Sequence, residues 1–171
     1  MSLLVRDKLK LTINEFLSSE SVCVLATSNS ASIPRATPVH YYFDESLMKD
    51  ASIFIMSDNN TLKLNNIEEN PHVSLTICDH NSFNPLDRSF ANCKGLQITG
   101  TAHLIPEDRA NDELKSALRY WKLYYTTGIP ASTTLPPMTI IAVKPTKYEL
   151  MDYSEEGIKS LGVTPFQTLY V

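Results

Sequence analysis

The sequence predicts a mainly β protein of the α+β class, with six antiparallel strands curled into a small barrel or sheet and helices flanking them. Six short β-rich segments are joined mostly by short links, and short links favour antiparallel pairing. Between and beside them lie three segments with helical patterns. With 171 residues, the chain is expected to form a single domain, 1–171, whose core needs neither a disulfide nor a metal.

Three helices are predicted. Apolar residues at three- and four-residue spacing place the first within 1–19. A short helix is expected over 61–69, because a Pro two residues after its end stops it. A longer helix over 107–125 begins after Pro106 and has acidic residues in its first turn, where the helix dipole favours them.

The strands are predicted from short apolar runs and from alternation of polar and apolar residues. Turn-forming residues at 28–32 join the first two strands into a hairpin. The six expected strands span 22–27, 33–43, 52–57, 72–78, 96–104 and 138–151.

Three prolines lie within these strands. Pro34 and Pro38 occupy the second strand, although proline cannot donate to a sheet ladder. Two interpretations remain open at this stage: an edge strand with a bulge, or a stretch whose backbone lies against a ligand. Pro145 is expected to break the last strand.

Two segments have no predicted helix or strand. Residues 79–94 are polar and irregular, and a structureless stretch of this length indicates a functional or interface loop. The tail, 153–171, ends in apolar residues, so we expect it to dock on the domain.

The charge balance is mildly acidic, with a net charge of −4. That balance argues against nucleic-acid and membrane partners, but a local positive site can still bind a small anion. The cysteines, Cys23, Cys78 and Cys93, are odd in number and form no C-x-x-C motif, as expected of reduced thiols. Charged residues in 1–11 argue against a signal peptide, so a cytoplasmic location is expected.

Several common functional motifs are absent. No glycine pair has the G-x-G spacing of a dinucleotide fingerprint, and Gly95 and Gly100 have P-loop spacing but are followed by Thr101 instead of Lys. Neither G-x-S-x-G nor H-E-x-x-H occurs. Four potential metal ligands match no standard zinc spacing, so no metal is expected; they are Cys78, His80, Cys93 and His103.

The first candidate site joins the end of one strand to the start of the 61–69 helix. Ser57, Asp58 and Thr61 lie there with Lys63. The first N–H groups of a helix lack internal partners and carry the positive end of the dipole, so with a lysine they suit a phosphate. The alternative is an ordinary helix cap with Lys63 as a solvated surface charge.

The second candidate site lies on the second strand. Arg35 could add a phosphate contact, and Thr37, Pro38 and Val39 could lie along a flat aromatic ligand. The alternative is plain sheet packing, with His40 as an ordinary strand histidine.

The order of these segments resembles a known family. The residues that carry the resemblance are Val22–Thr27, Pro34–Val39, Ile53–Ser57, Thr61-x-Lys63, Asn65–Ile67, Asn70–Leu75 and Leu96–Ala102. Together they are similar to the FMN-binding split β-barrel proteins related to pyridoxamine 5′-phosphate oxidase, specifically to a bacterial branch of that superfamily. The resemblance implies a six-stranded antiparallel split β-barrel of Greek-key type.

The resemblance also implies a homodimer with FMN in clefts between the subunits. By analogy, the phosphate would be bound by Lys63, Thr61 and Arg35. The flavin ring would lie along Thr37, Pro38 and Val39 of the second strand. It would also lie near the end of the third strand, at Ser57 and Asp58. Gln97 matches a family glutamine with an offset of two residues, which keeps it on the same face of the strand.

One departure limits the expected reaction. The oxidase itself ends in a segment with a binding arginine, whereas no arginine follows Arg119 here, so pyridoxamine phosphate oxidation is not expected. The expected function is an FMN-dependent oxidoreductase or flavin reductase-like protein with a small-molecule substrate. The alternatives are a haem- or flavin-binding carrier without turnover, and a structural dimer without cofactor. No residue stands out as catalytic.

Overall fold

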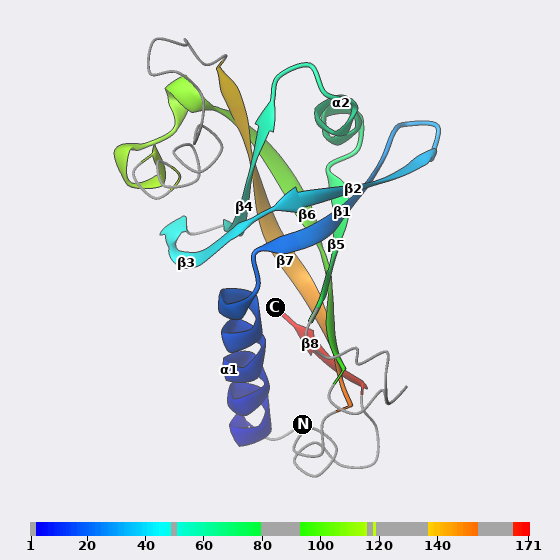
Figure 1. Cartoon of the computed structure of the whole chain (residues 1–171), viewed down its shortest axis with the longest axis vertical. Helices are drawn as coiled ribbons and strands as arrows, with labels where there is room; N and C mark the ends of the chain where they lie inside the picture. Colours follow the sequence, from blue (N-terminus) through cyan, green and yellow to red (C-terminus); the bar gives the residue numbers. More distant parts are fainter. Residues whose placement is uncertain (1–2, 49–50, 80–92, 116–117, 119–136, 154–165) are drawn as a thin grey trace, which may run out of the picture.

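The strands of the protein form one antiparallel sheet, seen in Figure 1 with α2 and α1 at its opposite ends. The computed structural model describes residues 3–48, 51–79, 93–115, 118, 137–153 and 166–171. The strands are β1 (Val22–Ser28), β2 (Pro34–His40), β3 (Tyr42–Met48), β4 (Ala51–Asp58), β5 (His72–Cys78), β6 (Lys94–Pro106), β7 (Met138–Asp152) and β8 (Phe166–Tyr170). The helices are α1 (Leu3–Ser19) and α2 (Leu62–Glu69), with a 3₁₀ turn, η1, at Glu107–Arg109.

The strand order is β2-β1-β5-β6-β7-β4-β3, with β8 also paired to β7. The predicted class, a mainly β antiparallel fold with flanking helices, is therefore confirmed, although the sheet has eight strands rather than six. β2 and β3 stand at the two ends of this order, so the sheet curls without closing.

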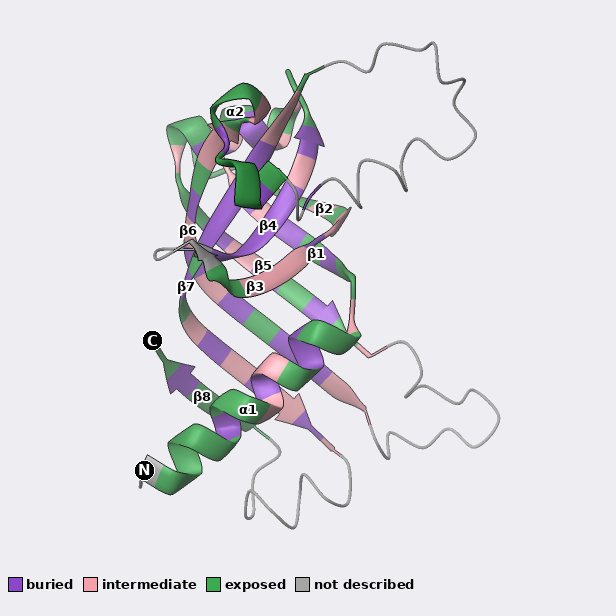
Figure 2. Cartoon of the chain, turned by 90° about the vertical axis from the view of Figure 1, so that its left-hand side faces the viewer, coloured by how far each residue is buried: buried purple, intermediate pink, exposed green. Residues whose placement is uncertain are grey.

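The core lies on the concave side of the sheet. Buried and exposed residues alternate along β1 and β5, as Figure 2 shows, because successive side chains of a strand point to opposite faces. α1 covers part of this core with Leu9, Ile13 and Leu17, each 1% exposed. A second apolar cluster lies around Phe54, Ile140 and Leu114.

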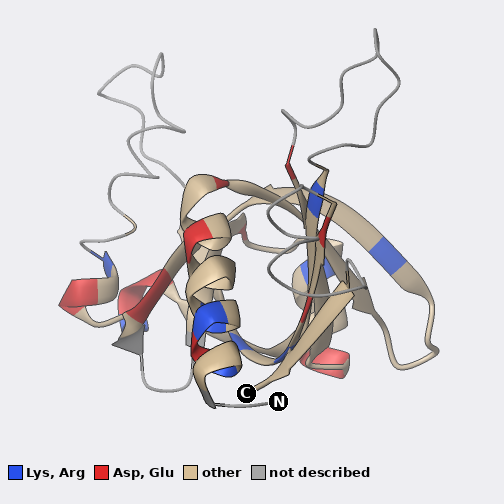
Figure 3. Cartoon of the chain, turned by 90° about the horizontal axis from the view of Figure 1, so that it is seen from below, with Lys and Arg blue, Asp and Glu red and all other residues tan. Residues whose placement is uncertain are grey.

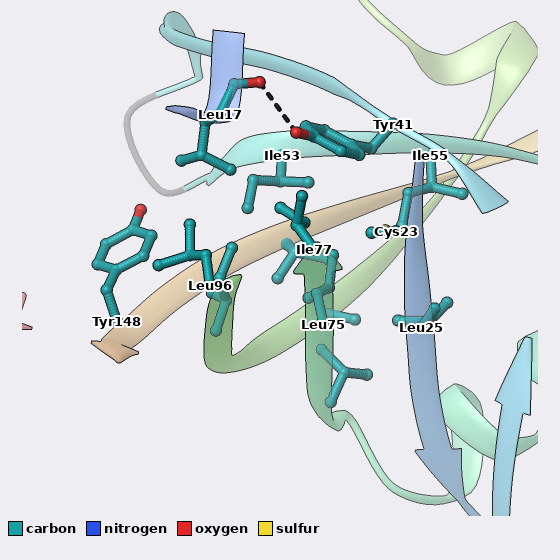
Figure 4. Packing of buried hydrophobic residues seen from close by; sticks show 14 of the residues in the cluster. Leu17, Cys23, Leu25, Tyr41, Ile53, Ile55, Leu75, Ile77, Leu96 and Tyr148 are labelled. Atoms are coloured by element: carbon teal, nitrogen blue, oxygen red, sulfur yellow. Dashed lines mark hydrogen bonds between the residues drawn. The ribbon is translucent and has the colours of Figure 1, made fainter. Parts of the chain in front are cut away.

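Tyr41 interrupts the strand predicted over 33–43. Its side chain is buried, and its hydroxyl donates to the Leu17 carbonyl at 2.9 Å, as Figure 4 shows. Its backbone N–H bonds to the Ser21 carbonyl at 3.0 Å. The chain therefore turns a corner at Tyr41, and the predicted single strand is two strands, β2 and β3, that pair with different neighbours.

The prolines of the second strand lie on a sheet edge. β2 pairs only with β1 in the described sheet, and their register is continuous from Val22↔His40 to Ser28↔Pro34. The edge-strand interpretation is confirmed, but the expected bulge is not present. An edge strand tolerates proline because one side of its backbone has no ladder partner.

Pro145 does not break the last strand, contrary to the prediction. β7 continues through it, and the register with β6 shifts from Thr99↔Lys147 to Gly100↔Pro145. Thr146 is thus the extra residue of a β-bulge, which is one of the few places where a strand accommodates proline. Gly100 is required at this point, because a Cβ there would lie 2.5 Å from the Lys144 carbonyl oxygen.

The tail docks as expected, and it does so as a strand. β8 pairs with β7 from Lys147↔Tyr170 to Met151↔Phe166, and Leu169 is only 4% exposed. The sequence did not predict this eighth strand, because five residues with mixed exposure have no clear alternation.

The helix predicted over 107–125 begins later than expected. η1 occupies Glu107–Arg109, and α-helical residues follow at 112–115. Asn111 caps this helix, since its side-chain oxygen accepts from the Leu114 N–H at 2.8 Å. Residue 118 is also helical, while the rest of this prediction and most of the predicted 79–94 loop lie outside the described residues.

Burial makes one cysteine unreactive. Burial raises the pKa of the Cys23 thiol to about 12, so this side chain stays a neutral core residue. Cys78 is exposed at the end of β5, and Cys93 is half-buried just before β6. Among the described helices, none has the length and apolar character needed to cross a membrane.

We expect Gly100→Ala to lower the free energy of unfolding by about 1–3 kcal/mol, because the added methyl group meets a backbone oxygen that cannot move without disturbing the bulge. Urea denaturation measures this change in the free energy of unfolding. Gly95→Ala is the matched control: its Cβ would meet the flexible end of Met151 at 3.1 Å, so a smaller loss is expected. Equal losses in the two variants would contradict the proposed close approach.

Candidate functional site

The chain makes a tight turn between β4 and α2, where the first candidate site was predicted. Asn60 adopts a positive φ of 62°, a conformation that Asn tolerates better than most residues. The helix begins at Leu62, one residue later than predicted, and Thr61 is its N-cap residue, but the Thr61 side chain makes no capping hydrogen bond. Instead, its hydroxyl lies 3.1 Å from that of Ser57, which is 2% exposed. The turn thus presents two hydroxyl groups beside the first turn of a helix.

Arg35 approaches this turn from β2. It pairs with Thr27 of β1, and residues directly opposite each other in an antiparallel pair project to the same face. Thr27 in turn accepts a hydrogen bond from Asn66 of α2 at 3.0 Å. The start of β2 and the helix α2 therefore lie close together, which brings Arg35 near Lys63.

The electrostatics of Lys63 reflect these neighbours. Its pKa is lowered, first because burial disfavours the charged amine and also because Arg35 is nearby. Asp58 acts in the opposite direction and partly compensates. We call the group Arg35, Ser57, Asp58, Thr61 and Lys63 the basic corner.

The basic corner has the chemistry of a phosphate site. Two cationic side chains face one acidic one, and the helix dipole adds positive potential. The Thr61 hydroxyl lies beside them, while the buried Ser57 hydroxyl is engaged with the Asp58 carbonyl at 3.0 Å. A bound phosphate would relieve the repulsion between Arg35 and Lys63. The residues present therefore fit a phosphorylated cofactor, and what they supply is charge and orientation rather than a reacting group.

The other predicted site residues divide between the two faces of the sheet. Thr37 and Val39 lie opposite Leu25 and Cys23, so they share the face of Arg35. Pro38 lies opposite Val24 on the outer face.

Gln97 belongs to the outer face as well, because Thr76 pairs with both Val24 and Gln97. Its side-chain amide lies 3.4 Å from the Ser74 hydroxyl. Within one chain, the structure does not bring Gln97 to the basic corner.

No metal centre is found among the described residues, since no three potential ligands come together there. His72 and His103 are exposed on β5 and β6, and His40 is half-buried at the end of β2. His80 lies outside the described residues.

Sequence reasoning missed the role of Asn66. It ties α2 to β1 across 39 residues of sequence, and nothing in the local pattern indicates that partner. Glu69 acts similarly: its carboxylate accepts from both the backbone N–H and the hydroxyl of Ser30, at 2.9 and 2.7 Å. These contacts fix the helix that carries Lys63.

The open antiparallel sheet, with a proline-bearing edge strand and a short helix after β4, is that of a split-barrel protein. The chain belongs to the pyridoxamine 5′-phosphate oxidase family, because the model of that family matches residues 9–152. A search of curated proteins finds no match.

Solved structures share the fold at low sequence identity. A putative pyridoxamine 5′-phosphate oxidase from Listeria innocua has 20% identity and a TM-score of 0.60, with 83% of this chain and 97% of that one covered. The heme storage protein HutZ from Vibrio cholerae has 16% identity and a TM-score of 0.58, with 80% and 89% covered. An FAD-binding protein from Mesorhizobium loti has 16% identity and a TM-score of 0.58, with 88% and 94% covered.

The pKa of Lys63 should respond in opposite directions to its two neighbours. Asp58→Asn removes a negative charge and is expected to lower that pKa further, whereas Arg35→Gln removes a positive charge and is expected to raise it. Both side chains are exposed, so folding should be preserved. NMR titration of the Lys63 amine measures the effect, with Lys8→Gln on α1 as the control. Unchanged titration in both variants would show that the three side chains are not neighbours.

Proposed function

We propose that this protein binds FMN, with the phosphate in the basic corner, and acts as an FMN-dependent oxidoreductase of the flavin reductase type. The observation that carries the proposal is the approach of Lys63 and Arg35 to each other beside the first turn of α2. Asp58 offsets part of the repulsion between these two cations, and a bound phosphate would offset more of it. The family supports this choice, because flavin binding is common among split-barrel proteins.

In this proposal, Lys63, Thr61 and Arg35 bind the phosphate. The flavin ring lies along the unpaired edge of β2, against Thr37, Pro38 and Val39, with Ser57 and Asp58 at the inner end of the cleft. Pro38 and its neighbours point to opposite faces because they alternate along the strand, and a ligand lying along the strand edge can contact side chains of both faces. When bound, FMN supplies the redox chemistry, and the residues of this chain bind and orient it.

We further propose a homodimer that uses the outer face of β1 and β2. Val22 and Val24 are 47% and 41% exposed there, next to exposed Ala36 and Pro38. An exposed apolar patch of this kind is typical of a protein interface. Gln97 lies on the same face, so a partner subunit seated on it would bring Gln97 within reach of the cofactor cleft.

The proposed substrate is a small molecule. A cytoplasmic location fits a flavoprotein of this kind with free cysteines. A haem-binding role is the second candidate, because HutZ is a heme storage protein and another structure with the same fold is a heme-binding protein from Mycobacterium smegmatis.

The absorbance spectrum of purified protein tests the cofactor. FMN binding predicts flavin bands and release of FMN on denaturation, whereas a Soret band after haem addition, with no uptake of FMN, would favour the haem role.

Lys63→Ala should weaken FMN binding by about 1.5–3 kcal/mol, or roughly one to two orders of magnitude in Kd, because a charge-assisted contact is lost. Lys8→Ala, an exposed lysine on α1, is the matched control and should bind as the wild type does. Equal affinity in the two variants would place the phosphate elsewhere.

Val24→Lys should convert the proposed dimer into a monomer, because it puts a charge in the centre of the exposed apolar face. Light scattering coupled to gel filtration measures the mass, and FMN affinity should fall in the same variant. Leu11→Lys is the control, since Leu11 is an apolar residue 60% exposed on α1, away from that face. A Val24→Lys variant that remains dimeric would rule out this interface.

A further inference from the structure

A second candidate binding site lies at the end of the barrel opposite α2. A cavity of about 270 Å³ opens there between α1, β7 and β8. Figure 3 looks at this end of the molecule and shows acidic and basic residues along α1. None of the residues lining the cavity belongs to the basic corner, so the two sites are separate.

The inner wall of the cavity is apolar and well packed. Ile13 of α1 is 1% exposed, Leu169 of β8 is 4% exposed and Tyr148 of β7 is 6% exposed. Ser52, 8% exposed, lies beside the Tyr148 hydroxyl and gives the floor a polar point. Such a surface suits a flat apolar group with one polar contact at its inner end.

The rim of the cavity carries charges of both signs, with one more basic than acidic side chain. Arg6 and Lys10 come from α1 and Lys144 from β7, against the acidic Asp7 and Glu45.

Glu45 is already engaged at this rim, since it accepts from Lys10 at 3.2 Å and from Asn14 at 3.2 Å. Arg6 donates to the Tyr170 carbonyl at 3.3 Å, which holds its guanidinium at the rim. Arg6 and Lys10 have N–H donors beyond these contacts, which favours an anionic ligand over a cationic one.

We propose that this cavity binds a small aromatic carboxylate, with the ring against Ile13, Leu169 and Tyr148 and the carboxylate at Arg6 and Lys144. The ligand would contact α1 on one side and the paired strands β7 and β8 on the other. Its binding does not depend on FMN or on the basic corner.

Titration of the full-length protein with 2-naphthoate, followed by NMR, tests this proposal. Saturable binding is expected, with shifts of residues on α1 and β8. Arg6→Glu and Lys144→Glu should each weaken it about tenfold or more; both side chains are exposed, so the variants should fold. Lys8→Glu lies on the same helix but does not line the cavity, and it should stay within about twofold of wild type.

Two further measurements separate this site from the other one. Uncharged 2-naphthamide should bind more weakly than 2-naphthoate, and Lys63→Ala should leave naphthoate binding unchanged. Absence of saturable binding to the wild type, or equal affinity in Lys144→Glu, overturns the proposal. A loss of binding in Lys63→Ala overturns it as well, because the carboxylate would then occupy the basic corner.

Discussion

The arrangement of the sheet depends on how three other strands pair with β7. β6 pairs with it along nearly its full length, while β4 pairs with its other edge at residues 138–143 and β8 at residues 147–151. The bulge at Thr146 falls between these two partners, so the strand bends at the place where one neighbour replaces the other. The close backbone approach at Gly100 is the cost of that bend. β7 therefore joins the half of the sheet that carries the basic corner to the half closed by α1 and β8.

The local elements of this fold could be predicted from the sequence, and the long-range ones could not. Periodicity and turn residues were sufficient for α1, α2 and the β1–β2 hairpin, because each depends on residues close together in the chain. The corner at Tyr41 depends on a carbonyl 24 residues earlier, in α1. Continuation through Pro145 depends on a glycine in β6, and β8 becomes a strand only because β7 offers it an edge.

The candidate site, too, has one part that the sequence could predict and one part that it could not. Lys63, Thr61 and Ser57 could be identified from the sequence because they lie close together in it, where a strand is followed by a turn and a helix. Their proximity to Arg35 required the packing of α2 on β1 through Asn66 and Thr27, which no local pattern reveals. The outward orientation of Pro38 and Gln97 follows from strand register, and register is set by pairing across the sheet rather than by composition.

The prolines of β2 have a consequence for how the protein behaves at high concentration. An exposed edge strand is a template for further strands, and uncontrolled addition leads to aggregation. Pro34 and Pro38 remove two donors from β2 and make it a poor template for another chain. Two copies that associate are thus directed to meet through side chains on the outer face rather than by joining their sheets. The same edge stays accessible to small molecules while it resists incorporation into a growing fibril.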